Sequence, residues 1–270
     1  MIKLDVLEAV KDFFVGNPYP IFFSFSNIIL IPKKEVVNNW NDFRLISLCF
    51  FFNKLISKTI LSRLVNILLK IIFYNQTGFV KGRGFFDSVL LAQEITHDII
   101  AKVKGGNIIF KLDFTKAYDN MNWNFLYTIL FLFGFSQSFI LFISNNIENC
   151  YFSMIINGRN HNFFKSFQGL RQGDPLSHAL FIIIVEYLSM GIEELYKRYL
   201  KPFFHTISGL PITHLSFADN FIIFLKGTIN NIKVLVNFFL YFKICVFWLL
   251  IRKKEILLWL SQLIVVELVL

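Results

Sequence analysis

The chain has 270 residues, a formal net charge of +9 and a hydrophobic fraction of 55%, with 35 phenylalanines. This length excludes a peptide or a simple tail and suits one large domain or two small subdomains around a sizeable core. The basic excess favours an anionic partner, either nucleic acid or an acidic membrane surface, and does not choose between them.

The apolar composition calls for a test of membrane-spanning segments. The longest candidate, Val234 to Ile251, is interrupted by Asn237 and Lys243. The apolar tail from Ile256 to Leu270 is short for a span, which needs about 20 residues. Charges near the N-terminus interrupt the apolar stretch that a secretory signal needs. We therefore expect an intracellular protein, nuclear or cytoplasmic, without a signal peptide, while an anchor over 234–270 stays open.

Cysteine usage indicates a reducing compartment. The three cysteines, Cys49, Cys150 and Cys245, are far apart and odd in number. Neither a zinc knuckle nor a disulfide framework is expected from such spacing.

The first third of the chain predicts a mixed, mostly helical part. The expected elements are a helix over Leu4 to Phe14, a strand over Asn27 to Ile31, an amphipathic helix over Cys49 to Ile72 and a helix over Phe86 to Lys102. The amphipathic segment repeats apolar residues at helical spacing. Asp87 and Ser88 offer N-terminal caps for the last of these helices.

After Gly105-Gly106 the chain predicts a small sheet packed on helices. The expected elements are a strand over Asn107 to Leu112 that ends on Asp113, helices over Trp123 to Phe133 and Ser136 to Glu148, strands over Tyr151 to Ile156 and Phe163 to Gln168, a helix over Pro175 to Tyr199, a strand pair over His214 to Leu225 and a helix beyond Lys226. Asn157-Gly158 is a strong hairpin signal, and Pro175 suits the first turn of a helix. The predicted fold class is α+β with a small antiparallel sheet.

Two aspartates stand at the ends of apolar strands. Asp113 follows Ile-Ile-Phe-Lys-Leu, and Asp219 lies in Ser-Phe-Ala-Asp-Asn. Carboxylates in such apolar surroundings need compensation, and Mg²⁺ supplies it because a hard divalent ion binds carboxylates together with substrate phosphates. The alternative is that both are ordinary turn or strand-end residues, because aspartate is common in turns.

Several sequence motifs follow one another in order along the chain. Three of them are Lys111-Leu-Asp-Phe-Thr-Lys-Ala-Tyr-Asp119, Gly169-Leu-Arg-Gln-Gly-Asp-Pro-Leu-Ser177 and Phe217-Ala-Asp-Asn220. Upstream motifs are Leu30-Ile-Pro-Lys33, Asp42-Phe-Arg-Leu-Ile-Ser-Leu48 and Gln76-Thr-Gly-Phe-Val-Lys-Gly-Arg83. Together they resemble motifs of reverse transcriptases, and most closely those of the non-LTR, LINE-type retrotransposons of plants. The resemblance covers about Val6 to Leu225, and it implies the fingers and palm of a right-hand polymerase with the thumb largely absent.

By resemblance, the boundaries are a fingers-like part at 1–105, a palm with the metal site at 106–226, and a residual helix with an apolar tail at 227–270. Asp113 and Asp219 would hold two Mg²⁺ ions, with Mn²⁺ as a substitute and the Phe114 carbonyl as a further ligand. The expected partners are an RNA template, a DNA primer and deoxynucleoside triphosphates, with no membrane. The implied reaction is nucleotidyl transfer to a primer 3′-hydroxyl.

The resemblance also assigns a nucleotide pocket. Lys33 and Arg44 would contact the triphosphate, Tyr118 would exclude a 2′-hydroxyl by its bulk, and Gln172 with Gly173 would line the pocket. A solvated basic face and a core tyrosine are the alternatives for Lys33, Arg44 and Tyr118.

Four further residues are assigned to the nucleic acid. Arg171 would lie beside the template, and Gln76, Gly82 and Arg83 would contact template or primer. For Asp174, which precedes Pro175, a helix cap is an equal explanation.

Three positions depart from the family pattern. Asn220 stands where the family has a second catalytic aspartate, and Leu45 and His178 stand where it has prolines. An amide at position 220 brings no charge, so we expect weaker metal binding and a degenerate or truncated copy of an element. The alternative functions are a nucleic-acid-binding remnant without turnover and a membrane-anchored protein that uses 234–270.

Overall fold

The computed structural model describes residues 2–18, 20–97, 106–114, 116, 118–203 and 212–247. The chain divides into two compact units, one of Met1–Asn66 with Tyr118–Leu180 and one of Ile67–Ala117 with Phe181–Leu270. Helices α2 (Phe51–Ile71) and α6 (Pro175–Arg198) contribute residues to both units. The end of the helix expected up to Lys102 and the apolar tail lie outside the described residues.

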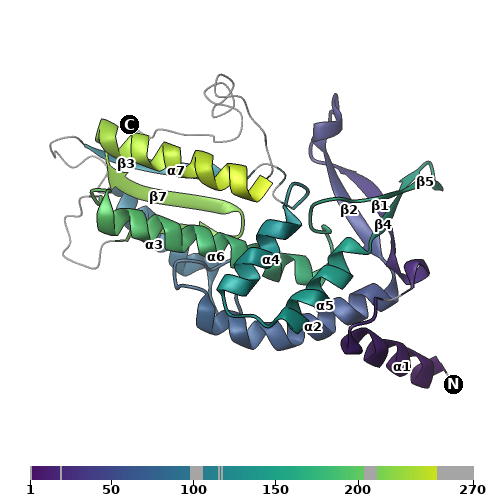
Figure 1. The fold of residues 1–270 in the computed structure, drawn as a ribbon. Helices are drawn as coiled ribbons and strands as arrows, with labels where there is room; N and C mark the ends of the chain where they lie inside the picture. The colour runs from purple at the N-terminus through teal and green to yellow at the C-terminus, as the bar shows by residue number, and fades with distance from the viewer. Residues whose placement is uncertain are drawn as a thin grey trace. The chain divides into compact units, whose positions relative to one another are not determined.

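The first unit is built on a four-stranded sheet in the order β2-β1-β4-β5 (Figure 1). Its elements are α1 (Ile2–Val15), β1 (Phe25–Pro32), β2 (Phe43–Cys49), α4 (Trp123–Leu132), α5 (Gln137–Glu148), β4 (Tyr151–Ile156), β5 (Arg159–Lys165) and 3-10 turns at Ile21–Ser24 and Trp40–Asp42. β1 pairs antiparallel with β2 and parallel with β4. The α5 cap is the expected Ser136, whose hydroxyl accepts the Phe139 amide at 3.2 Å.

The β4–β5 hairpin turns at Asn157-Gly158, as predicted. Both residues have positive φ angles, 51° and 75°, which a two-residue turn of this kind requires. Because the loop is only two residues long, β5 begins at Arg159, four positions before the expected Phe163.

The second unit is built on an antiparallel sheet in the order β3-β7-β6. Its elements are α3 (Phe85–His97), β3 (Asn107–Asp113), β6 (His214–Phe217), β7 (Asn220–Lys226) and α7 (Ile229–Phe247). A buried cluster of apolar side chains joins α3 to the sheet, namely Ile95, Ile109, Phe203, Leu215 and Phe224. α3 begins at Phe85, so Asp87 and Ser88 lie in its first turn, where the Ser88 hydroxyl bonds Thr77 Oγ1 at 3.1 Å.

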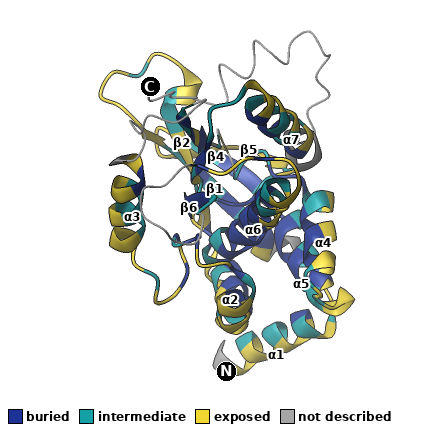
Figure 2. Cartoon of the chain, turned by 90° about the vertical axis from the view of Figure 1, so that its left-hand side faces the viewer, coloured by how far each residue is buried: buried dark blue, intermediate teal, exposed yellow. Residues whose placement is uncertain are grey.

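Much of helix α6 is dark blue in Figure 2, the colour of buried residues. Among the described residues it is also the one helix long and apolar enough to cross a membrane, but 72% of its apolar window is buried inside the protein. Such burial is what the core helix of a globular protein shows. The candidate span at Val234 to Ile251 extends beyond the described residues.

Glu186 on α6 is fully buried, and burial raises its pKa to about 7 although the Phe73 amide donates to its Oε2 at 3.1 Å. The native state therefore holds a proton that the unfolded state releases near pH 4.5. We expect unfolding free energy to fall by up to about 3 kcal/mol as pH rises from about 4.5 to 7.

Glu186→Gln should remove most of this pH dependence and stabilise the protein at pH 8. The measurement is denaturant unfolding across that pH range. Glu194→Gln, an exposed change on the same helix, serves as the control and should keep the wild-type slope. An unchanged slope in Glu186→Gln would contradict the assignment.

The backbone amide of Leu45 makes no hydrogen bond to β1, so a proline at this position would remove none. The Ser47 amide donates to the Gln172 carbonyl at 2.8 Å and so points away from β1, and Leu45, two residues earlier, has the same orientation. Proline is tolerated where an edge-strand amide makes no ladder bond.

Leu45→Pro is therefore expected to change the free energy of unfolding by less than about 1 kcal/mol. Ile46→Pro, one position further, removes an amide that faces β1 and should cost at least about 2 kcal/mol. Thermal unfolding of both variants checks the prediction, and equal losses would contradict the register.

Candidate active site

The predicted metal residues lie at one end of the β3-β7-β6 sheet. Asp113 ends β3 and is in register with Asn220, the first residue of β7. Phe217 pairs with Asn220 across β6 and β7, which leaves Ala218 and Asp219 as the two turn residues. The strand pairing thus brings the backbones of Asp113 and Asn220, 107 positions apart, side by side, with Asp219 adjacent.

The turn is shaped by an unusual residue. Ala218 has a φ of 54°, in the left-handed region that non-glycine residues rarely adopt. It is buried, whereas Asp219 is half-buried and Asn220 is exposed. The Asn220 side-chain amide donates to Asp219 Oδ1 at 3.2 Å. Where the family pattern has a second carboxylate, this chain has a neutral group that bonds the first one.

The turn offers oxygen ligands of the kind that a hard divalent cation binds. Among the side chains that the structure describes, no group of three or more His, Cys, Asp or Glu could hold a metal ion. Phe114, the expected carbonyl ligand, follows β3 directly, and its ring packs edge-on against Phe181 with centroids 6.3 Å apart. Oxygen donors of this kind are the ligands that Mg²⁺ prefers.

The predicted nucleotide residues belong to the first unit. Arg44 in β2 is exposed and pairs in register with Ile31, while the Lys33 amide donates to the Asp42 carbonyl at 2.8 Å and so continues the same ladder. The Lys33 ammonium group donates to the Asn41 carbonyl at 3.0 Å. The two cations are thus brought to the same end of the β1–β2 pair.

Gln172 and Gly173 run along the edge of β2. At Gly173, with φ 104°, a Cβ would lie 3.0 Å from the Ser47 carbonyl oxygen and 3.6 Å from the Ile46 side chain. Because strand side chains alternate, Ile46 shares a face with Arg44. Gly173 therefore lies against the Arg44 face, and its lack of a side chain permits the close approach.

Gln172 instead lines a cavity of about 270 Å³ on the Leu45 and Ser47 face. The cavity is walled mainly by apolar side chains of the sheet, and its polar wall includes Asp119 and Arg171. Gln172 Nε2 donates to Asp119 Oδ1 at 3.1 Å. Sequence reasoning gave Asp119 no role, although it ends the first motif, because its partner is 53 positions away.

Tyr118 is half-buried, and its ring lies 5.4 Å from that of His178. Its carbonyl accepts the Leu170 amide at 2.6 Å, so the two motifs are joined through the backbone. A Cβ at Gly169 would lie 2.6 Å from the Asp119 carbonyl oxygen, which explains the glycine there. Burial lowers the pKa of His178, so its ring is neutral at physiological pH.

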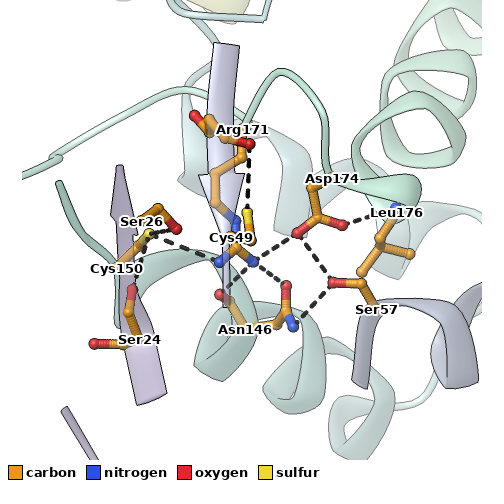
Figure 3. Close-up of polar contacts among 10 residues, drawn as sticks. Ser24, Ser26, Cys49, Ser57, Asn146, Cys150, Arg171, Asp174 and Leu176 are labelled. Carbon is orange, nitrogen blue, oxygen red and sulfur yellow. Dashed lines mark hydrogen bonds and ion pairs between the residues drawn. The ribbon is translucent and has the colours of Figure 1, made fainter. Parts of the chain in front are cut away.

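Arg171 does not lie on an open template surface. Its guanidinium forms a buried ion pair with Asp174 at 2.8 Å, with side-chain exposures of 4% and 2% (Figure 3). It also donates to the carbonyl and to Oδ1 of Asn146, at 3.0 and 2.6 Å. Asp174 in turn accepts the Leu176 amide at 3.0 Å and the Ser57 hydroxyl at 3.0 Å. The alternative explanation of Asp174 as a helix cap is confirmed, and Arg171 is its buried counter-ion.

The Arg83 side chain binds backbone carbonyls of the chain itself. Its guanidinium donates to the carbonyls of Ile72, Phe73 and Gln76, in the segment that follows α2. Gln76 is fully buried. At Gly82 (φ 81°), a Cβ would meet no atom within 4 Å.

The architecture and the carboxylate-bearing hairpin define a right-hand polymerase palm. Residues 31–244 match the family described as reverse transcriptase (RNA-dependent DNA polymerase). The chain belongs to this family.

Proteins of transposable elements are similar in sequence to this chain. The chain is 27% identical over 186 residues to the transposon TX1 149 kDa protein of Xenopus laevis, a match that covers 67% of this chain and 14% of that protein. It is 25% identical over 217 residues to the Pol polyprotein of the type-2 retrotransposable element R2DM of Drosophila melanogaster, covering 77% and 19%. These relatives support the non-LTR branch of the family, and the chain spans less than a fifth of their length.

Solved structures give the same fold. A telomerase of Candida tropicalis, determined in complex with a TWJ fragment of telomeric RNA, matches with a TM-score of 0.57 at 16% identity, over 83% of this chain and 40% of that one. A telomerase of Candida albicans matches with a TM-score of 0.53 at 13% identity, over 82% and 40%. The α+β fold of reverse transcriptase fingers and palm is thereby confirmed.

Proposed function

We propose that this chain is an RNA-directed DNA polymerase domain that adds deoxynucleotides to a primer paired with an RNA template. The observation that carries the proposal is the strand register that aligns Asp113 with Asn220 beside Asp219. Assignment to a plant element rests on the motif resemblance alone.

Asp113, Asp219 and the Phe114 carbonyl would hold two divalent ions, Mg²⁺ or Mn²⁺. Such ions, when bound, neutralise charge on the attacking and leaving oxygens of an in-line displacement. The turn itself keeps Asp219 at the end of the sheet, and the Asn220 amide occupies part of its hydrogen-bonding capacity. This competition supports the proposal that position 220 impairs the activity.

The nucleotide would be held by residues of the first unit. Arg44 offers a forked guanidinium and Lys33 a compact ammonium, both suited to triphosphate oxygens. Tyr118 would exclude a 2′-hydroxyl by bulk, and Gly173 would leave room for the nucleotide beside the Arg44 face. Gln172 would act from the cavity side, where it bonds Asp119.

Primer extension on a homopolymer RNA template with Mg²⁺ or Mn²⁺ tests the proposal. We expect weak, metal-dependent synthesis that falls at least about 100-fold in Asp219→Asn, because it removes a charge aimed at the reacting centre. Asp5→Asn, an exposed aspartate of α1, is the matched control and should leave the rate unchanged. Equal activity in Asp219→Asn and wild type would contradict the proposal.

The Asn220–Asp219 bond favours a second candidate, a nucleic-acid-binding domain without turnover. The basic excess of the chain would then track a phosphate backbone, with affinity that falls steeply as salt rises. Salt-sensitive RNA binding together with no extension under either metal would select this candidate.

A further inference from the structure

The segment Asn75 to Gly78 lies directly against the strand that leads to the Asp219 turn. The Ser216 amide donates to the Asn75 carbonyl at 2.9 Å, and the Thr77 amide donates to the Ser216 carbonyl at 3.1 Å. Gln76 and Ser216 form a parallel bridge. The segment thus adds one bridge of strand pairing to β6, just before the turn begins.

Gln76 extends this contact to the turn itself. Its side chain is fully buried, and Oε1 accepts both the Gly78 amide at 2.8 Å and the Ala218 amide at 3.2 Å. Its Nε2 has no hydrogen-bond partner among the described residues. The acceptor oxygen, and not the amide donor, is therefore the group that joins the segment to the turn.

Gly78 allows the two backbones to approach closely. A Cβ at this position would lie 2.3 Å from the Ala218 nitrogen, 3.0 Å from its Cα and 3.1 Å from the Phe217 carbonyl carbon. These atoms are backbone and cannot rotate away. Any side chain at position 78 would push the turn off the segment.

Ala218 needs such support. A non-glycine residue at φ 54° costs about 1–3 kcal/mol and persists only where its surroundings hold it in place. Its amide nitrogen is the atom that Gln76 binds. The strained residue immediately precedes Asp219 in the chain, so its conformation fixes the direction in which that carboxylate leaves the turn.

We propose that Gln76 is a positioning residue for the Asp219 turn, which holds the Ala218 amide through Oε1 while Gly78 permits the contact. Its catalytic consequence rests on the proposed polymerase function. Its structural consequence does not, because a looser turn is measurable in a protein without activity.

Two substitutions of similar size distinguish the hydrogen-bond acceptor of Gln76 from the space that its side chain fills. Gln76→Met fills the space with no strong acceptor, whereas Gln76→Glu keeps an acceptor oxygen for the Ala218 amide. The first measurement is hydrogen exchange of the Phe217 to Asn220 amides. We expect about tenfold faster exchange in Gln76→Met, the equivalent of about one net hydrogen bond, and near wild-type exchange in Gln76→Glu.

The second measurement is single-nucleotide incorporation. In Gln76→Met we expect kcat to fall about tenfold with the KM for the nucleotide unchanged, and in Gln76→Glu we expect kcat to be restored. A general folding defect would instead speed exchange in β3 as well and affect both variants alike. Gly78→Ala should reproduce the Gln76→Met pattern.

Wild-type exchange at the turn in Gln76→Met would overturn the proposal, and so would equal loss in the Met and Glu variants. Fast exchange in Gln76→Met in a protein that shows no polymerisation at all would uphold the positioning role and count against the polymerase function instead.

Discussion

Replacing Arg171 with methionine is expected to lower the free energy of unfolding by about 3–5 kcal/mol, because it leaves the Asp174 carboxylate buried without its counter-ion. The pair is 2.8 Å apart and almost fully buried. The same substitution leaves both oxygens of Asn146 without the guanidinium that binds them. Chemical denaturation at neutral pH measures the loss.

The double variant Arg171→Met, Asp174→Asn is the matched control. Asparagine keeps the cap of α6, since its side-chain oxygen accepts a helix amide as well as aspartate does, but it carries no charge. We expect it to recover at least about 1–2 kcal/mol relative to Arg171→Met alone. A loss below about 1 kcal/mol in Arg171→Met would contradict the buried-pair account.

Asn220→Asp is expected to raise the polymerisation rate at least about tenfold in Mg²⁺. A carboxylate restores the missing anion and ends the competition in which the Asn220 amide bonds Asp219 Oδ1. Primer extension at saturating nucleotide measures the gain. Asn220→Ala removes the amide without adding charge, and it should give a smaller effect.

Asn220→Asp should also change the melting temperature of the protein. Without metal, two adjacent carboxylates repel, so the melting temperature should fall below that of the wild type. Divalent metal should then raise it by more than it raises that of the wild type, because ligand binding to the native state stabilises it. An equal metal response in both proteins would show that position 220 plays no part in binding the ion.

Local patterns predicted most of the fold. The apolar strand before Asp113, the Asn157-Gly158 turn and the Ser136 cap are set by near neighbours in the chain, and each is found where it was expected. The hairpin at Phe217 to Asn220 was predicted for the same reason.

Non-local contacts were beyond such reasoning. Strand β2 was missed because its side chains are mostly exposed or half-buried and its stability comes from pairing with β1. Arg171 was placed beside a template by the family resemblance, whereas its side chain binds Asn146, 25 positions away. Gln76 binds a turn 142 positions further along the chain. Local sequence patterns do not predict contacts between residues so far apart in the chain.

The most direct test of the account is a double-mutant cycle on Mn²⁺ affinity, measured by electron paramagnetic resonance of free Mn²⁺. If Asp113 and Asp219 serve one metal site, each single change to asparagine should weaken binding about tenfold or more, and the double variant should lose little beyond the stronger single effect. Additive losses, or affinities equal to that of the wild type, would show that the two aspartates do not share a metal.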